Sequence, residues 1–262
     1  MNLQSTTAGC VLLAALAAAP LPAAAQNQPS GDRRVMVGAG IQSKPTYPGA
    51  DSSRITFLPV VDVWRDGQPM VVESPDQSFG ITLIGKRGGR FAAGPALGFA
   101  PTRSADDLPG LAKVGFGVEA GGFVEVWPLA PLRLRGELRQ GIGAHKALTG
   151  DVSADLVLRQ GNEGAIFTAG PRLRWGSAKY NRTYFGVPAP GVGALTPFDP
   201  ESGIYAIGAA AGLRLPLGRR FGVYSYVGYD RLTSKAADSP IVATGRADQF
   251  SGGVALTYKF GL

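Results

Sequence analysis

The chain has 262 residues and a formal net charge of +7 at pH 7, and only 17% of its residues are charged. A hydrophobic fraction of 45% excludes an intrinsically disordered chain, and the absence of a G-X-Y period excludes collagen. The chain contains no run of about 18 consecutive apolar residues, so the sequence predicts no membrane-spanning helix.

The N-terminus has the pattern of a secretory signal. An apolar run at 11–19 (VLLAALAAA) is followed by a proline break and by three alanines at 23–25, which match an A-x-A cleavage site. The run is far shorter than the roughly 20 apolar residues that cross a membrane as a helix. We therefore expect a cleaved signal peptide at 1–25 and a single domain at 26–262. Cys10 leaves with the signal, so no disulfide is expected.

Apolar and polar residues alternate through most of the remaining chain, with the period of two that indicates β-strands. Segment 131–142 shows this clearly, because leucines on one face alternate with arginines and a glutamate on the other. In 203–214 the pattern assigns Tyr205 to the apolar face and Arg214 to the polar face. We expect about 12 strands, and at least about 10, in chain order: 34–42, 54–64, 69–74, 77–86, 89–99, 113–127, 131–142, 151–160, 164–175, 203–215, 219–230 and 248–260.

Charged residues gather on the faces opposite the apolar ones. A soluble β-sandwich or lipocalin-like barrel also alternates, but it encloses its apolar face. The charged faces of this chain favour the reverse arrangement, in which the barrel encloses the charged face and lipid surrounds the apolar one. The sequence therefore predicts an all-β, antiparallel transmembrane β-barrel. The residues expected to face its interior are Arg133, Arg135, Glu137, Arg139, Arg172, Arg174, Arg214, Glu119, Glu125 and Asp155.

Two interpretations of these interior charges remain open. The charges either form a structural ion-pair network that fills a narrow barrel, or they line a pore that favours anions. A barrel of about 12 strands lies between the filled eight-stranded class and the open porins of about 16 strands. We favour the structural network.

The expected connections fall into two length classes at opposite ends of the strands. The short ones lie at 65–67, 86–89, 128–131, 161–163 and 216–219. The long ones lie at 43–53, 100–112, 143–150, 176–202 and 231–247, with a brief turn near Pro75. Short periplasmic turns and long outer loops are typical of bacterial outer-membrane barrels. Aromatic residues near the expected strand ends, including Trp64, Trp127 and Trp175, are expected to form membrane-interface girdles.

Four stretches resemble, in chain order, sequences of the MipA/OmpV family of outer-membrane proteins. They are 45–51 (PTYPGAD), 181–187 (NRTYFGV), 229–232 (YDRL) with 236–242 (AADSPIV), and 256–260 (LTYKF). The resemblance implies a barrel in the outer membrane of a Gram-negative bacterium. It also implies a non-enzymatic scaffold linked to a murein lytic transglycosylase and its associated synthase, or a role in adhesion or envelope stress. It implies no catalytic residues and no cofactor.

Little in the sequence indicates catalysis. His145, the single histidine, would be the base of an outer-membrane hydrolase, but no G-x-S-x-G elbow occurs, so we expect a solvent-facing loop histidine. Asp106 and Asp107 would suit a protease or calcium site, although two loop acids are more often solvated. One histidine and one cysteine are too few for a zinc site.

Loop 176–202 is long, rich in proline and aromatic. A loop of this length is often functional, so Tyr184, Phe185 and Phe198 are candidate partner contacts, although the loop would equally serve as a packed cap over the barrel mouth. The expected surroundings are outer-membrane lipid, with no nucleic-acid partner for an exported protein. A narrow channel for small solutes and an adhesin remain alternatives to the scaffold.

Overall fold

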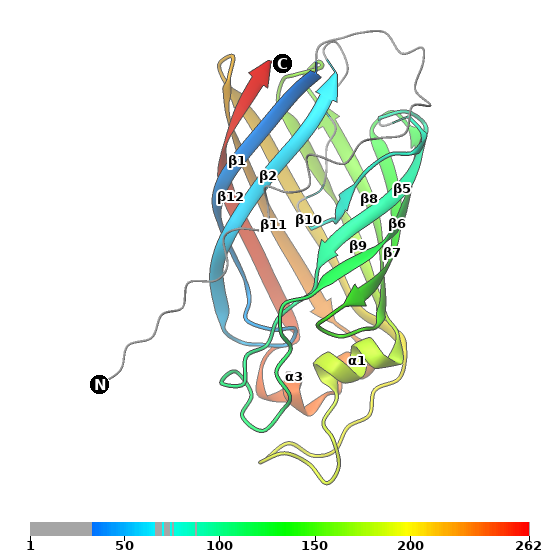
Figure 1. Cartoon of the computed structure of the whole chain (residues 1–262), viewed down its shortest axis with the longest axis vertical. Helices are drawn as coiled ribbons and strands as arrows, with labels where there is room; N and C mark the ends of the chain where they lie inside the picture. Colours follow the sequence, from blue (N-terminus) through cyan, green and yellow to red (C-terminus); the bar gives the residue numbers. More distant parts are fainter. Residues whose placement is uncertain (1–32, 66–69, 71–73, 75, 87, 262) are drawn as a thin grey trace, which may run out of the picture. The chain divides into compact units, whose positions relative to one another are not determined.

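A computed structural model describes residues 33–65, 70, 74, 76–86 and 88–261 (Figure 1). The expected signal peptide at 1–25 lies outside the described residues. None of the described helices is long and apolar enough to cross a membrane.

The described chain forms one antiparallel sheet, which confirms the expected all-β architecture. The sheet order is β2-β1-β12-β11-β10-β9-β8-β7-β6-β5-β3, and β4 also pairs with β5. The strands are β1 (Arg33–Pro45), β2 (Ser53–Arg65), β3 (Phe79–Gly80), β4 (Ile84–Gly85), β5 (Phe91–Phe99), β6 (Val118–Leu129), β7 (Leu132–Ile142), β8 (Leu148–Arg159), β9 (Ile166–Gly176), β10 (Gly203–Leu217), β11 (Phe221–Leu232) and β12 (Asp248–Gly261). The helices are α1 (Ala178–Phe185), α2 (Ser234–Ala237) and α3 (Pro240–Thr244).

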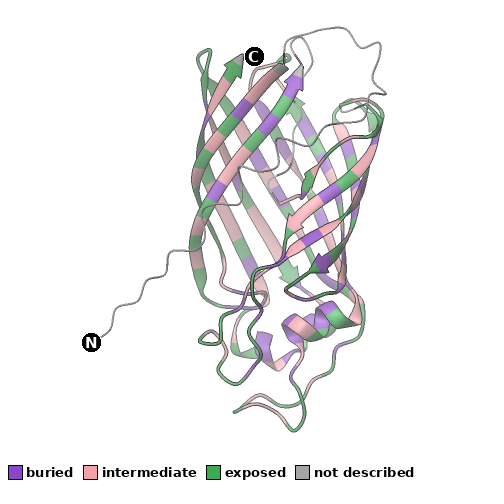
Figure 2. Cartoon of the chain, viewed as in Figure 1, coloured by how far each residue is buried: buried purple, intermediate pink, exposed green. Residues whose placement is uncertain are grey.

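The alternation in sequence becomes an inside and an outside in the structure. In β7, Arg133 and Arg135 are 1% and 5% exposed, whereas Leu134 between them is 41% exposed. The same inversion recurs along the sheet, where exposed and buried residues alternate (Figure 2). In water this arrangement would be unfavourable, because apolar side chains would stay hydrated while charges were buried. Hydrocarbon around the sheet removes the cost of exposing the apolar side chains. The exterior of the sheet therefore faces lipid.

The two classes of connection lie at opposite ends, as the sequence predicts. Residues 130–131, 160–165 and 218–220 form short turns at one end. The long connections, which include 100–117 and 177–202, lie at the end where α1 and α3 are found (Figure 1). By the general pattern of outer-membrane barrels, the short-turn end is the periplasmic one.

The chain between β2 and β5 differs from expectation. Of the expected strand 69–74, only Met70 and Ser74 are described, and neither belongs to a strand. The expected strand 77–86 is reduced to the two short pieces β3 and β4. Its interruption lies opposite Pro95, whose carbonyl accepts from the Ile81 N–H at 3.1 Å. Proline has no N–H to donate back, so the ladder breaks there and Leu83 and Ile84 both lie exposed.

Two further expectations were wrong: that Tyr205 lies on the apolar exterior face and that Trp64 belongs to an exterior girdle. A register shift between Ile204 and Ala206 in β10 turns Tyr205 inward, because a bulge adds one residue and reverses the alternation. Trp64 does not contribute to an exterior girdle. It is buried with Met36 and Met70 on the inner side of the barrel.

A charge on the lipid face tests this arrangement. Val152 is exposed near the middle of β8, so Val152→Arg should lower the free energy of unfolding by about 2–4 kcal/mol if it lies at the bilayer midplane. Urea unfolding in lipid vesicles measures the change, with Val152→Leu as the matched control. A Val152→Arg protein that is equally stable and dissolves without detergent would contradict the lipid-facing assignment.

Candidate functional site

The interior is crossed by a network of ion pairs on β6, β7, β8 and β9. Alternate residues of neighbouring strands point to the same side, so charges spaced by two residues meet inside the barrel. The fully buried Asp155 binds Arg133 at 2.6 Å and Arg172 at 2.8 Å. Further pairs join Arg135 to Glu137 at 2.7 Å and join Arg139 to Glu119 at 2.9 Å.

The segment that precedes β3 enters this network. The Ser74 hydroxyl donates to Asp155 at 3.2 Å and accepts from Arg133 at 3.0 Å. The Gln77 amide donates to the Ser153 hydroxyl at 2.7 Å. Ser74 and residues 76–78 therefore act as an internal plug. The sequence predicts instead that residues 74, 77 and 78 belong to strands, with a turn between them.

Asp76 gives the plug its charge. Its carboxylate accepts from Arg172 at 2.7 Å and from Arg174 at 3.1 Å. A cavity of about 10 Å³ remains beside these groups, which is room for about one water molecule. The interior at this level is filled by paired charges. That satisfies the requirement that charges removed from water be neutralised by partners.

The structure places the expected interior charges in two groups. Nine of them belong to the network or contact it, although Glu125 lies at longer distances, 3.6 Å from Arg135 and 4.0 Å from Arg133. Arg214 lies apart from them, on β10, where its guanidinium is 3.6 Å from the carboxylate of Asp62. Asp151 and Asp230, which the sequence analysis did not select, both bind Arg174. Asp151 is a polar residue on the inner face of β8 and could have been found by extending the alternation two residues upstream of Ser153.

A packed cap closes the end with the long connections. Tyr184 and Phe185 of α1 are both 0% exposed, which agrees with the packed cap of the two alternatives and leaves neither side chain free to contact a partner. Phe198 is half-buried and packs with Tyr47 and Ile241 from other connections. The signal for this burial was present in the sequence: apolar residues at positions 180, 184 and 185 share one face of a helix.

Hydrogen bonds from side chains to backbone carbonyls join the segments of the cap. Arg103, a buried residue of the connection 100–117, donates to the carbonyls of Tyr184 at 3.3 Å and Ala112 at 2.9 Å. The Tyr184 hydroxyl donates to the Pro101 carbonyl at 2.8 Å, and the Ser239 hydroxyl donates to the Phe185 carbonyl at 2.6 Å. Burial raises the pKa of Tyr184 above its ordinary value, so its hydroxyl remains a donor.

His145 lies beneath the cap and is 3% exposed, so the expectation of a solvent-facing histidine was also wrong. Its Nδ1 accepts from the Ala147 N–H at 3.2 Å, so its Nε2 carries a proton and donates to Glu119 at 3.0 Å. The ring lies edge-on to Tyr180 and against Gly141, where a Cβ would come within 2.2 Å of it. The glycine therefore admits the ring to the interior, which is why the loop histidine turns inward.

This placement gives no arrangement for nucleophilic catalysis. In the described part of the chain, His145 bonds to Glu119 and the Ala147 amide rather than to a serine hydroxyl. Asp107 accepts from the Ser104 N–H at 2.6 Å and lies 3.4 Å from Arg54, while Asp106 is exposed. The described residues contain no group of three His, Cys, Asp or Glu side chains placed to hold a metal.

Removing one member of the network tests its structural role. Asp155→Ala should lower the free energy of unfolding by about 3–5 kcal/mol, because Arg133 and Arg172 would lose the carboxylate that neutralises them. Asp199→Ala breaks the exposed pair with Arg182 and should cost no more than about 1 kcal/mol. Urea unfolding in detergent micelles compares the two, and equal small effects would show that the network adds little stability.

The comparisons with solved structures and with curated proteins add little. The crystal structure of the outer-membrane protein OprG from Pseudomonas aeruginosa is similar at 9% sequence identity, with 88% of this chain and 98% of that chain covered and a TM-score of 0.22. That likeness is too weak to support an argument. No curated protein matches the sequence.

The family model of the MltA-interacting protein MipA matches residues 37–260, from β1 to β12. The match confirms the family resemblance seen in the four sequence stretches. A β-barrel with a lipid-facing exterior is the structure that this resemblance implies. The chain belongs to the MltA-interacting protein MipA family, and it is a β-barrel of the bacterial outer membrane.

Proposed function

We propose that the protein is a non-enzymatic scaffold that binds a murein lytic transglycosylase, and through it an associated synthase, at the periplasmic face of the outer membrane. The observation that carries this proposal is the filled and capped interior. Ion pairs and the plug (Ser74 and residues 76–78) occupy the inside of the barrel, and buried aromatic residues close its mouth. The chemistry left to the protein is therefore that of its surfaces.

The family description supplies the class of partner, since it names an interaction with MltA. A periplasmic enzyme meets the short-turn end of the barrel. The described basic residues at this end include Lys86, Arg90, Arg219 and Arg220, all of them exposed. The acidic Glu163 at the same end is already paired with Lys259. This surface would suit a partner with an acidic docking face, because complementary charge speeds association and selects the partner.

Charge reversal at this end tests the scaffold. Arg219→Glu combined with Arg220→Glu should weaken binding of a purified lytic transglycosylase from the same bacterium by about tenfold or more at low salt. Lys179→Glu with Lys235→Glu makes the same change of charge on the opposite, cap end and should leave the affinity unchanged. Biolayer interferometry with the full chain in detergent measures both. Loss of binding in the cap variant alone would contradict the proposal and favour an outer-loop adhesin.

Conductance separates the scaffold from the channel. Purified protein in a planar bilayer should give no steady ion current, because Arg133, Arg172 and the plug fill the interior. A stable, anion-selective current that changes with Arg133→Leu would contradict a filled scaffold and would support a channel.

A further inference from the structure

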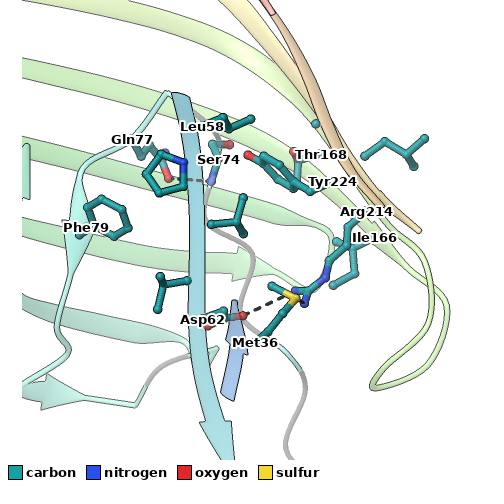
Figure 3. A pocket seen from close by; sticks show the side chains of 15 residues that line it. Met36, Leu58, Asp62, Ser74, Gln77, Phe79, Ile166, Thr168, Arg214 and Tyr224 are labelled. Atoms are coloured by element: carbon teal, nitrogen blue, oxygen red, sulfur yellow. Dashed lines mark hydrogen bonds and ion pairs between the residues drawn. The ribbon is translucent and has the colours of Figure 1, made fainter. Parts of the chain in front are cut away.

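The wall of the barrel has a seam between its two edge strands, β2 and β3. Ten antiparallel pairings separate these strands along the sheet path, an even number, so β2 and β3 run in the same direction. In the described part of the chain, no backbone pairing joins β2 to β3 or β4. A cavity of about 100 Å³ lies at this seam and is lined by both edges (Figure 3).

Both edges carry features that disfavour closure of the seam. Pro59 stands in the middle of β2, and proline is confined to edge strands because it cannot serve a ladder on both sides. On the other edge, Pro95 breaks the pairing of β5 with the 79–85 segment, which leaves β3 and β4 short and irregular. Short, bulged and proline-bearing edges are the means by which sheets avoid further strand pairing.

The seam opens toward hydrocarbon. Val61 and Phe79 flank the cavity and are 43% and 42% exposed on the lipid-facing exterior. Behind them the cavity wall is largely apolar and includes Leu58 and Ile166 (Figure 3). Along the described lining, an apolar chain would contact apolar side chains from the bilayer to the cavity, and hydrophobic burial would favour its entry.

The inner end of the cavity holds Arg214, which pairs with Asp62. The Arg214 side chain is 13% exposed, and its ion pair with Asp62 spans 3.6 Å. It also contacts the sulfur of Met36, a weak acceptor, and the Trp64 ring, whose centroid is 6.0 Å away, while Tyr224 and Glu163 act on its charge. A guanidinium can donate five hydrogen bonds and is recognised best by a bidentate oxyanion.

We propose that the seam is a lateral binding site for a single-chain amphiphile with an anionic head, whose chain enters between β2 and β3 and whose head binds Arg214. A long-chain carboxylate and a lysophospholipid phosphate both have this chemistry. The cavity accommodates the part of the chain next to the head, and the rest extends through the seam into the bilayer. The plug residues Ser74 and Gln77 line one side of this cavity, and the cap does not contribute to its lining.

Trp64 provides the readout, because it lies inside the barrel against Met36 and Arg214 rather than in contact with bulk lipid. In a Trp127→Phe, Trp175→Phe background, a dibrominated fatty acid should quench Trp64 fluorescence in a saturable manner. A brominated lysophosphatidic acid tests the phosphate source in parallel, and a brominated alcohol of equal length tests the need for a negative head. Saturable quenching by either anionic probe, with the alcohol at least about tenfold weaker, supports the site.

Two variants assign the site to the seam. Arg214→Gln should weaken anionic-probe binding about tenfold, with partial retention in Arg214→Lys, and Thr168→Phe should reduce quenching by filling the cavity. Arg246→Gln, at an exposed position just before β12 and on the opposite end of the barrel, is the matched control and should bind as the parent protein does. Binding is compared only for variants whose circular dichroism spectrum shows the same β-sheet content as that of the parent protein. Quenching that is linear with probe, equal for the alcohol and unchanged in Arg214→Gln would reflect partitioning into the micelle and would overturn the proposal.

Discussion

The structure depends on the neutralisation of charge inside a wall that faces hydrocarbon. Asp155 is the centre of this arrangement, since it is fully buried and binds Arg133 and Arg172. Charges placed inside such a wall cannot rely on bulk water, so each needs a partner with good geometry. The interior face of the sheet and the plug meet this requirement together, because Ser74, Asp76 and Gln77 bond to residues of β7, β8 and β9.

The same requirement explains why the sheet has a seam. Ser74 and residues 76–78 lie in the interior before β3, and β3 runs in the direction in which β2 ran, so the two edge strands are parallel. Pro59 and Pro95 make both edges poor partners for further pairing. The plug that neutralises the interior therefore leaves an opening in the wall, and Arg214 lies behind that opening, apart from the main network.

Function moves to the surfaces because the inside is occupied. The cap over one mouth is an aromatic core built from five long connections, with α1 at its centre. Its buried hydrogen bonds, such as the one from Arg103 to the Tyr184 carbonyl, make it a fixed lid of the fold. The basic short-turn end and the lipid-facing seam remain as places where another molecule can bind.

The sequence by itself determined most of the strands, their two faces and the two classes of connection, because a period of two fixes which side of a regular strand each residue faces. That local rule sufficed to place Arg133 and Arg172 on the face that proves to be the interior. Only the tertiary structure decided the inward turn of His145 and the plug formed by Ser74 and residues 76–78, since both depend on residues far away in the chain, such as Glu119 and Asp155. Alternation carries no record of such distant contacts, so these two features could be known only from the folded chain.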